Sequence, residues 1–239
     1  MDIYMDFVND LTEMIDNINV ANNIIAVYVG GSVSRGDYVV GVSDIDIYVV
    51  TKDSEENNTI NTAVQSLAYK KIQELLSWCP DGVTVAFTTY KEIKSGVSWL
   101  GAGSEYYTFQ ENAKLLYGKD IRKDIIEPTE NDIRKSSEQA IAQIKHIVQQ
   151  DLSNIKIDKY FIRGIFGTAF SAMHFYLCLH HQYIRGKQKI TDAYCEINQE
   201  RAVFANSIME LWYVFSHRPL YEIEIKQLIT DTIRIIEDM

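Results

Sequence analysis

Basic residues are scarce in this chain and nowhere form a cluster. Of its 239 residues, 23 are Lys or Arg and 33 are Asp or Glu, which gives a net charge of −10. Proteins that bind nucleic acid neutralise its phosphates with clustered Lys and Arg, so a nucleic-acid partner is disfavoured. The acidic balance fits a cationic small molecule as a partner, and it equally fits a protein whose charges only keep it soluble.

Cysteine is scarce as well. Cys79, Cys178 and Cys195 stand far apart and form no C-x-x-C pair, which excludes a zinc ribbon and a disulfide framework. No Lys or Arg precedes Arg35, so the positive region of a signal peptide is missing. The longest nearly uncharged stretch, residues 164–179, is shorter than the ~20 residues that span a bilayer. We therefore expect a cytoplasmic protein with reduced thiols and no membrane association.

The N-terminal half alternates between helical and strand patterns. Apolar residues recur at helical spacing over residues 3–18 and 58–79, and Pro80 follows the second of these segments. Short runs rich in Val and Ile, bounded by glycine or polar residues, predict strands over 22–31, 44–50 and 82–90. This order of elements predicts an α/β (α+β) unit built around one sheet.

The character of the sequence changes after about residue 110. The segments that follow show helical spacing or are apolar nearly all round, and none shows a comparable strand pattern. We therefore predict an N-terminal domain over residues 1–120 and an all-helical domain over residues 121–239. The predicted helices of the second domain lie within 128–152, 158–184, 199–217 and 221–239.

The most informative stretch is "VGGSVSRGDYVVGVSDIDIYVV", residues 29–50. Alternate residues of a strand point to opposite faces, so Asp44 and Asp46 share one face and Ile45 and Ile47 share the other. Two carboxylates spaced ~6.6–6.8 Å along a strand can converge on Mg²⁺, which prefers oxygen ligands.

The glycines and the serine before this strand suit an anion. Glycine lets the backbone approach a phosphate closely, and successive N–H groups can form an anion-binding nest. Ser32 adds a hydroxyl donor. The alternative is an edge strand with a polar face that follows a glycine turn.

The combination of Gly-Ser, a loop of about ten residues and Asp-x-Asp resembles the nucleotidyltransferase superfamily. The resemblance implies that Asp44 and Asp46 hold Mg²⁺ as catalytic metal ligands. It also implies that Gly30, Gly31 and Ser32 contact the phosphates of the nucleotide. Arg35 lies in the same loop, either against a phosphate or in solvent.

Within the superfamily, the chain is most similar to the aminoglycoside adenylyltransferases of the streptomycin/spectinomycin type. The similarity is carried by "VTVAFTTYKEI", "LLYGKDIRKDIIEPTENDI" and "YIRGKQK". It implies a nucleotidyltransferase core with a mixed sheet, followed by an all-α bundle that binds the acceptor. It also implies transfer of AMP from ATP to a hydroxyl of a small cationic molecule, release of pyrophosphate, and a role in antibiotic resistance.

One position departs from that pattern. The family has a glutamate before the third strand, which takes the proton from the attacking hydroxyl, and this chain has Gly82 there. Asp81 is the neighbouring carboxylate and is our candidate base if the strand begins irregularly. Asp81 is equally well explained as a turn residue of "PDG". The missing glutamate leaves a second hypothesis open, an antitoxin-type or regulatory protein of the same fold that AMPylates or binds a partner protein.

The remaining candidates are weaker. The five histidines are scattered through the chain, and buried structural roles are favoured over a zinc site. The segment "SWLGAGSEYYTF" either stacks on a ligand as a mobile loop or combines core residues with a turn, and the second interpretation is favoured.

Overall fold

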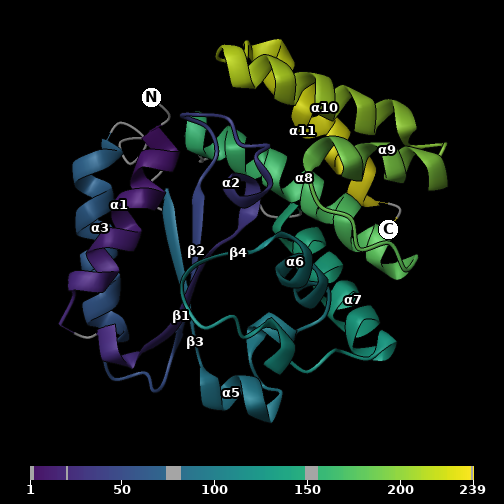
Figure 1. The fold of residues 1–239 in the computed structure, drawn as a ribbon. Coiled ribbons are helices and arrows are strands. Elements are labelled where there is room, and N and C mark those ends of the chain that lie inside the picture. Colours follow the sequence, from purple (N-terminus) through teal and green to yellow (C-terminus); the bar gives the residue numbers. More distant parts are fainter. Residues whose placement is uncertain (1–2, 20, 74–81, 149–155, 238) are drawn as a thin grey trace. The chain divides into compact units, whose positions relative to one another are not determined.

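The computed structural model describes residues 3–19, 21–73, 82–148, 156–237 and 239 (Figure 1). The chain forms two compact units, Met1–Pro128 and Thr129–Met239. The predicted α/β core with a mixed sheet, followed by a helical region, is confirmed. The assignment of residues 1–120 to catalysis and of 121–239 to acceptor binding stays a prediction.

The first unit is built on a four-stranded sheet in the order β3-β2-β1-β4. Strand β1 lies antiparallel to both β2 and β4, whereas β2 and β3 are parallel, so the sheet is mixed. The strands are β1 (Ile24–Val29), β2 (Ile45–Thr51), β3 (Val83–Thr89) and β4 (Lys114–Gly118). The three N-terminal strands form where alternating or continuous apolar runs predict them.

One face of the sheet is covered by α1 (Ile3–Asn17) and α3 (Asn57–Lys71), which lie side by side (Figure 1). Helix α1 buries Phe7, Leu11 and Ile15, whose spacing of about four residues places them on one side of the helix. They join a core with apolar residues of the three N-terminal strands, which are Ile24, Val27, Val29, Ile45, Ile47, Val49 and Val83.

A second core covers the opposite face of the sheet. Here Ala26, Tyr28 and Val50 contact side chains from the segment after β3, including Leu100 and Phe109. That segment contains α5 (Tyr90–Ser95), η2 (Trp99–Gly101), α6 (Glu105–Asn112) and, after β4, η3 (Arg122–Asp124). The core interpretation of "SWLGAGSEYYTF" therefore agrees with the structure.

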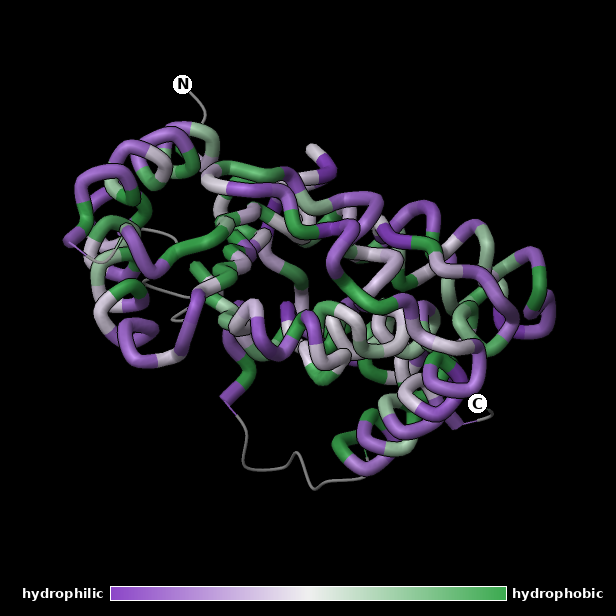
Figure 2. Tube along the Cα trace, turned by 60° about the horizontal axis from the view of Figure 1, so that its bottom comes forward, coloured by the Kyte–Doolittle hydropathy of each residue, from purple (hydrophilic) through white to green (hydrophobic). Residues whose placement is uncertain are grey.

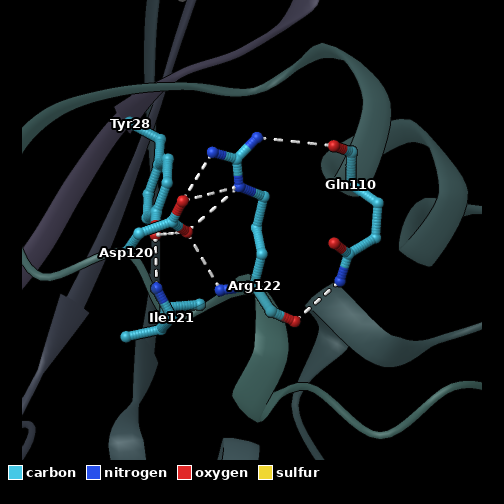
Figure 3. A network of polar contacts seen from close by, with 5 residues as sticks. All are labelled: Tyr28, Gln110, Asp120, Ile121 and Arg122. Carbon is cyan, nitrogen blue, oxygen red and sulfur yellow. Dashed lines mark hydrogen bonds and ion pairs between the residues drawn. The ribbon is translucent and has the colours of Figure 1, made fainter.

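A polar network joins this second face to the segment that follows β4 (Figure 3). The hydroxyl of the fully buried Tyr28 donates to Asp120 Oδ1 at 3.1 Å and accepts the N–H of Ile121 at 2.8 Å. Arg122 Nε donates to the Asp120 carboxylate, and Gln110 Nε2 donates to the carbonyl of Arg122. The hydrogen bonds that Arg122 donates to the Asp120 carboxylate lower the pKa of Asp120 to about 2. The network ties β1, α6 and η3 together.

Two elements of the first unit differ from the expectation. Strand β4 was not predicted, because its residues are half-buried or exposed and it pairs only along one edge of the sheet. Helix α2 (Gly31–Arg35) occupies the beginning of the segment expected to be a loop. Its side chains Ser32, Val33 and Ser34 are buried, and Gly36 ends it with a φ of 81°.

The second unit consists of helices. Central helix α8 (Lys159–Leu179) contacts α7 (Glu130–Val148), α9 (Lys187–Ile197), α10 (Ala202–His217) and α11 (Glu222–Glu237). Helix α7 begins with a side-chain cap, because Thr129 Oγ1 accepts the N–H of Asp132. Figure 2 shows hydrophobic and hydrophilic residues interspersed along the chain, and helices α7, α9 and α11 each bury only one side.

Helix α8 has the length and composition of a membrane span, with 21 residues and a mean hydropathy of 1.2. Half of that stretch is nevertheless buried inside the protein. The buried side chains include Phe166, Phe170 and Met173, which contribute to the interior of the helical unit. Its apolar character is therefore accounted for by its central position.

Candidate functional site

The candidate site begins where β1 ends. The N–H of Gly30 donates to the carbonyl of Asp46 at 2.8 Å, so the end of β1 is bonded to the start of β2. A Cβ on Gly30 would overlap the ring of Tyr48. Glycine at residue 30 therefore allows that ring to lie against the end of β1.

Gly31 lies directly against the carboxylate of Asp46. Its φ is +60°, a conformation that favours glycine, and a Cβ there would overlap Asp46 Oδ2. The glycine turn and the acidic strand, which the sequence places fifteen residues apart, are therefore in contact.

Asp44 and Asp46 flank the first residue of β2. Strand β2 begins at Ile45, so Asp44 lies one residue before it, and both carboxylates are half-buried. Asp46 shares a sheet face with Tyr48, while Ile45 and Ile47 point into the opposite core. The N–H of Ile45 donates to the carbonyl of Gly82 at 2.9 Å, which fixes the backbone between the two aspartates.

Helix α2 presents its first turn beside Asp46. The first N–H groups of an α-helix have no carbonyl acceptor within the helix, so those at the start of α2 are suited to an anion. The hydroxyl of Ser34 does not add to these donors, because it donates to the carbonyl of Gly31 at 2.9 Å. Ser32 is 7% exposed and lies in this first turn.

Arg35 forms an ion pair within its own segment of the chain. Its guanidinium forms an ion pair with Asp37, with an N–O distance of 3.2 Å and side chains that are 18% and 42% exposed. A contact of Arg35 with phosphate therefore competes with this pair.

A model of the nucleotidyltransferase domain family matches residues 12–147, more than half of the chain. The chain belongs to the nucleotidyltransferase family. A search of curated protein sequences gives no significant match. The region matched by the family model includes β1, α2 and β2, and the glycines and the aspartates lie in or next to these elements.

Among solved structures, this nucleotidyltransferase is similar to the spectinomycin adenyltransferase AAD(9) from Enterococcus faecialis, solved with ATP and spectinomycin. The TM-score is 0.59 at 14% sequence identity, and the match covers 98% of each chain. At this identity the likeness shows a common fold. Since the coverage extends over both units, the helical unit belongs to that common fold as well.

The donors of the nucleotidyltransferase site fit a magnesium ion in type. The carboxylates of Asp44 and Asp46 offer hard oxygen donors, and Mg²⁺ is commonly held by one or two carboxylates together with phosphate oxygens. Within the described residues there is no group of three or more His, Cys, Asp or Glu that could hold a metal ion.

The candidate base is not placed by the structure. Asp81 lies outside the described residues. The register pairs Asp46 with Thr84 of β3, so the residues of β3 that share its face are Thr84, Ala86 and Thr88, preceded by Gly82. Within the described part of β3, this face therefore carries no carboxylate.

Tyr48 is a site residue that the sequence analysis missed. Its ring lies against Gly30 and packs edge-on against Trp99, with ring centroids 5.1 Å apart. Trp99 is held in turn by a hydrogen bond of 2.9 Å from its Nε1 to the carbonyl of Phe87. The alternation of β2 places Tyr48 on the same face as Asp46, and this alternation is the sequence pattern from which Tyr48 could have been predicted to lie near the site.

Proposed function

We propose that this nucleotidyltransferase transfers AMP from ATP to a hydroxyl group of a small, cationic molecule such as an aminoglycoside, and that it requires Mg²⁺. The observation that carries the proposal is the contact between the Asp46 carboxylate and Gly31 at the first turn of α2. A carboxylate and a set of backbone donors then adjoin each other, as a metal-bound triphosphate requires.

In the proposed reaction, the acceptor hydroxyl attacks the α-phosphorus of ATP. A new oxygen–phosphorus bond forms, the bond to the β-phosphate oxygen breaks, and pyrophosphate leaves. Asp44 and Asp46 would hold Mg²⁺, which neutralises charge on the phosphates and the leaving oxygen. Gly30, Gly31 and Ser32 would bind and orient the triphosphate, with Arg35 as a further contact. Most of the rate acceleration would then come from positioning and charge.

The proton of the acceptor hydroxyl needs a base, and Asp81 is our candidate. A cationic acceptor is supported by the net charge of −10 and by the whole-length likeness to an enzyme solved with spectinomycin. We assign the catalytic role to residues 1–120, acceptor binding to residues 121–239, and the reaction to the cytoplasm. Such an activity would confer antibiotic resistance.

A second function is favoured by one observation. The described part of β3 offers no carboxylate on the face of Asp46, where the family carries its base. A protein that binds nucleotide but transfers AMP slowly could instead AMPylate or bind a partner protein, as antitoxin-type members of this fold do.

The test is a measurement of pyrophosphate release with ATP and Mg²⁺ across aminoglycosides, lincosamides and a reaction without acceptor. We expect release that depends on one class of acceptor and that disappears in the Asp44→Asn/Asp46→Asn double variant. Asp53→Asn is the matched control, because Asp53 is an exposed aspartate that follows the opposite end of β2.

Release at the wild-type rate by the double variant would reject this mechanism. Absence of release with every acceptor, together with a stoichiometric protein partner after purification, would favour the second function.

A further inference from the structure

A side chain of α1 bonds to the segment between α2 and Asp44. The hydroxyl of Tyr4 donates to the carbonyl of Ser43 at 2.7 Å and accepts the N–H of Gly41 at 3.1 Å. Tyr4 is 1% exposed and comes from a helix 39 residues earlier in the chain. One phenol therefore bonds to two points of the segment that leads into the acidic strand.

This segment is also closed on itself. The carbonyl of Val39 accepts the N–H groups of Val42 and Ser43 at 3.0 and 2.9 Å. The N–H of Val39 donates to Ser43 Oγ at 2.9 Å. We call residues 37–43 the aspartate-approach loop. These internal hydrogen bonds give the loop a defined shape. The two hydrogen bonds to Tyr4 therefore fix the position of the whole loop.

Aromatic stacking adds to the attachment of the aspartate-approach loop to Tyr4. Tyr38, at the start of the aspartate-approach loop, stacks on Tyr4 with ring centroids 5.2 Å apart and an interplanar angle of 22°. The phenol of Tyr4 is thus held from both sides, through its ring by Tyr38 and through its hydroxyl by Gly41 and Ser43.

The carbonyl that Tyr4 holds has a direct consequence for Asp44. The carbonyl of Ser43 and the nitrogen of Asp44 belong to one planar peptide group, so fixing the first fixes the second. On its other side, Asp44 is followed by Ile45, whose N–H is bonded to the carbonyl of Gly82. The backbone around Asp44 is therefore held on both sides, by α1 and by Gly82, the residue before β3.

We propose that Tyr4 is a positioning residue for Asp44, which sets the direction of its carboxylate toward the metal and the nucleotide. The proposal rests on the proposed function of Asp44 as a metal ligand. Tyr4 touches neither substrate nor metal in this role and acts only through the aspartate-approach loop.

The test compares Tyr4→Phe with Tyr28→Phe. Tyr4→Phe keeps the ring and its stacking on Tyr38 but removes both hydrogen bonds. Tyr28→Phe is the matched control, because Tyr28 is also fully buried, donates to one oxygen and accepts one backbone N–H. The Tyr28 hydroxyl holds Asp120 and Ile121 instead of the aspartate-approach loop. The two variants therefore differ in the segment that is released, and a thermal melt confirms that both are folded.

The first measurement is hydrogen exchange of the amides of residues 39–45. We expect Tyr4→Phe to accelerate exchange of the Gly41 amide by about tenfold, which matches the loss of one buried hydrogen bond. The second is the Mg²⁺ concentration that gives half-maximal pyrophosphate release, which we expect to rise by about tenfold while the KM for the acceptor is unchanged. Tyr28→Phe should change neither.

The failures are distinguishable. Unchanged exchange and Mg²⁺ dependence in Tyr4→Phe, or equal changes in Tyr28→Phe, would overturn the positioning role and leave the proposed function intact. Calorimetry of the wild type with Mg²⁺ and ATP tests the function separately. If no binding is detected, the function of Asp44 as a metal ligand is rejected, and the metal-positioning role of Tyr4 is rejected with it.

Discussion

The Oδ2 atom of Asp46 lies where a Cβ of Gly31 would be. This contact joins the first turn of α2 to the acidic strand, and it makes the absence of a side chain at residue 31 a condition for the position of the carboxylate. The conformation of Gly31, with φ at +60°, is compatible with the same requirement.

We predict that Gly31→Ala abolishes Mg²⁺-dependent nucleotide binding. The added Cβ would displace the Asp46 carboxylate, and the left-handed backbone would add a strain of about 1–2 kcal/mol. Gly36→Ala is the matched control, because Gly36 has a φ of +81° with nothing within 4 Å of the added Cβ. The Gly36→Ala variant therefore has a similar backbone strain, but its Cβ does not displace a carboxylate. Calorimetric titration with ATP and Mg²⁺ measures the difference, and equal loss of binding in both variants would contradict the prediction.

The position of Gly82 allows a gain of function to be designed. Ile45 pairs with Val83, so residue 82 lies beside Asp44, on the sheet face that carries Asp46. A glutamate introduced here would stand at the position where the resemblance to the adenylyltransferases implies a base. General-base catalysis contributes typically about 10²–10⁴-fold to a rate, so we predict that Gly82→Glu raises the kcat of an Asp81→Asn variant by about 100-fold.

Gly82→Gln is the control for this prediction, since it has the same length and no basic carboxylate. The measurement is pyrophosphate release at saturating ATP with the best acceptor. An equal rate in the Glu and Gln variants, both made with Asp81→Asn, would show that the introduced carboxylate is not in reach of the hydroxyl.

The helical unit contains a buried histidine whose protonation opposes folding. His174 is 1% exposed, its Nδ1 lies 2.9 Å from the carbonyl of Ile184, and its Nε2 lies 3.4 Å from the sulfur of Cys178. The carbonyl can only accept, so Nδ1 carries the proton and the Cys178 thiol donates to Nε2. Burial and the nearby Arg185 lower the pKa of His174 to about 3.

We predict that the unfolding free energy falls as the pH decreases from about 6.5 toward 3. The unfolded chain takes up a proton on this imidazole near pH 6.5 and the folded chain does not, so acid favours unfolding with a slope of up to about 1.4 kcal/mol per pH unit. His174→Gln keeps a donor for the carbonyl of Ile184 and should remove this part of the slope. Urea unfolding at pH 7.5, 6 and 5 measures it, and identical pH dependence in the two proteins would refute the prediction.

Much of the first unit could be predicted from local patterns. The apolar spacing of α1 and the Val/Ile runs of β1, β2 and β3 each describe one element and the face that it buries. The positions of Gly30, Gly31, Asp44 and Asp46 at strand ends follow from the same patterns. Strand alternation also placed Asp46 opposite to Ile45 and Ile47, because this property depends only on neighbouring residues.

Other features depend on residues that are distant in the sequence. Strand β4 is short and largely exposed, and only its pairing with β1 makes it a strand. Helix α2 is too short to show a helical period, so the pattern of its five residues indicated a loop. Asp81, chosen as the base from its neighbourhood in the sequence, lies outside the described residues, and its role stays a prediction.

The sequence by itself determined which residues of this protein lie at strand ends and which face each strand buries, because backbone preferences and apolar spacing act over a few residues. The tertiary structure alone decided that β2 lies between β1 and β3, that Gly31 meets Asp46, and that Tyr4 holds the loop before Asp44. These contacts join segments that are distant along the chain, and they form only when the whole unit buries its two cores at once.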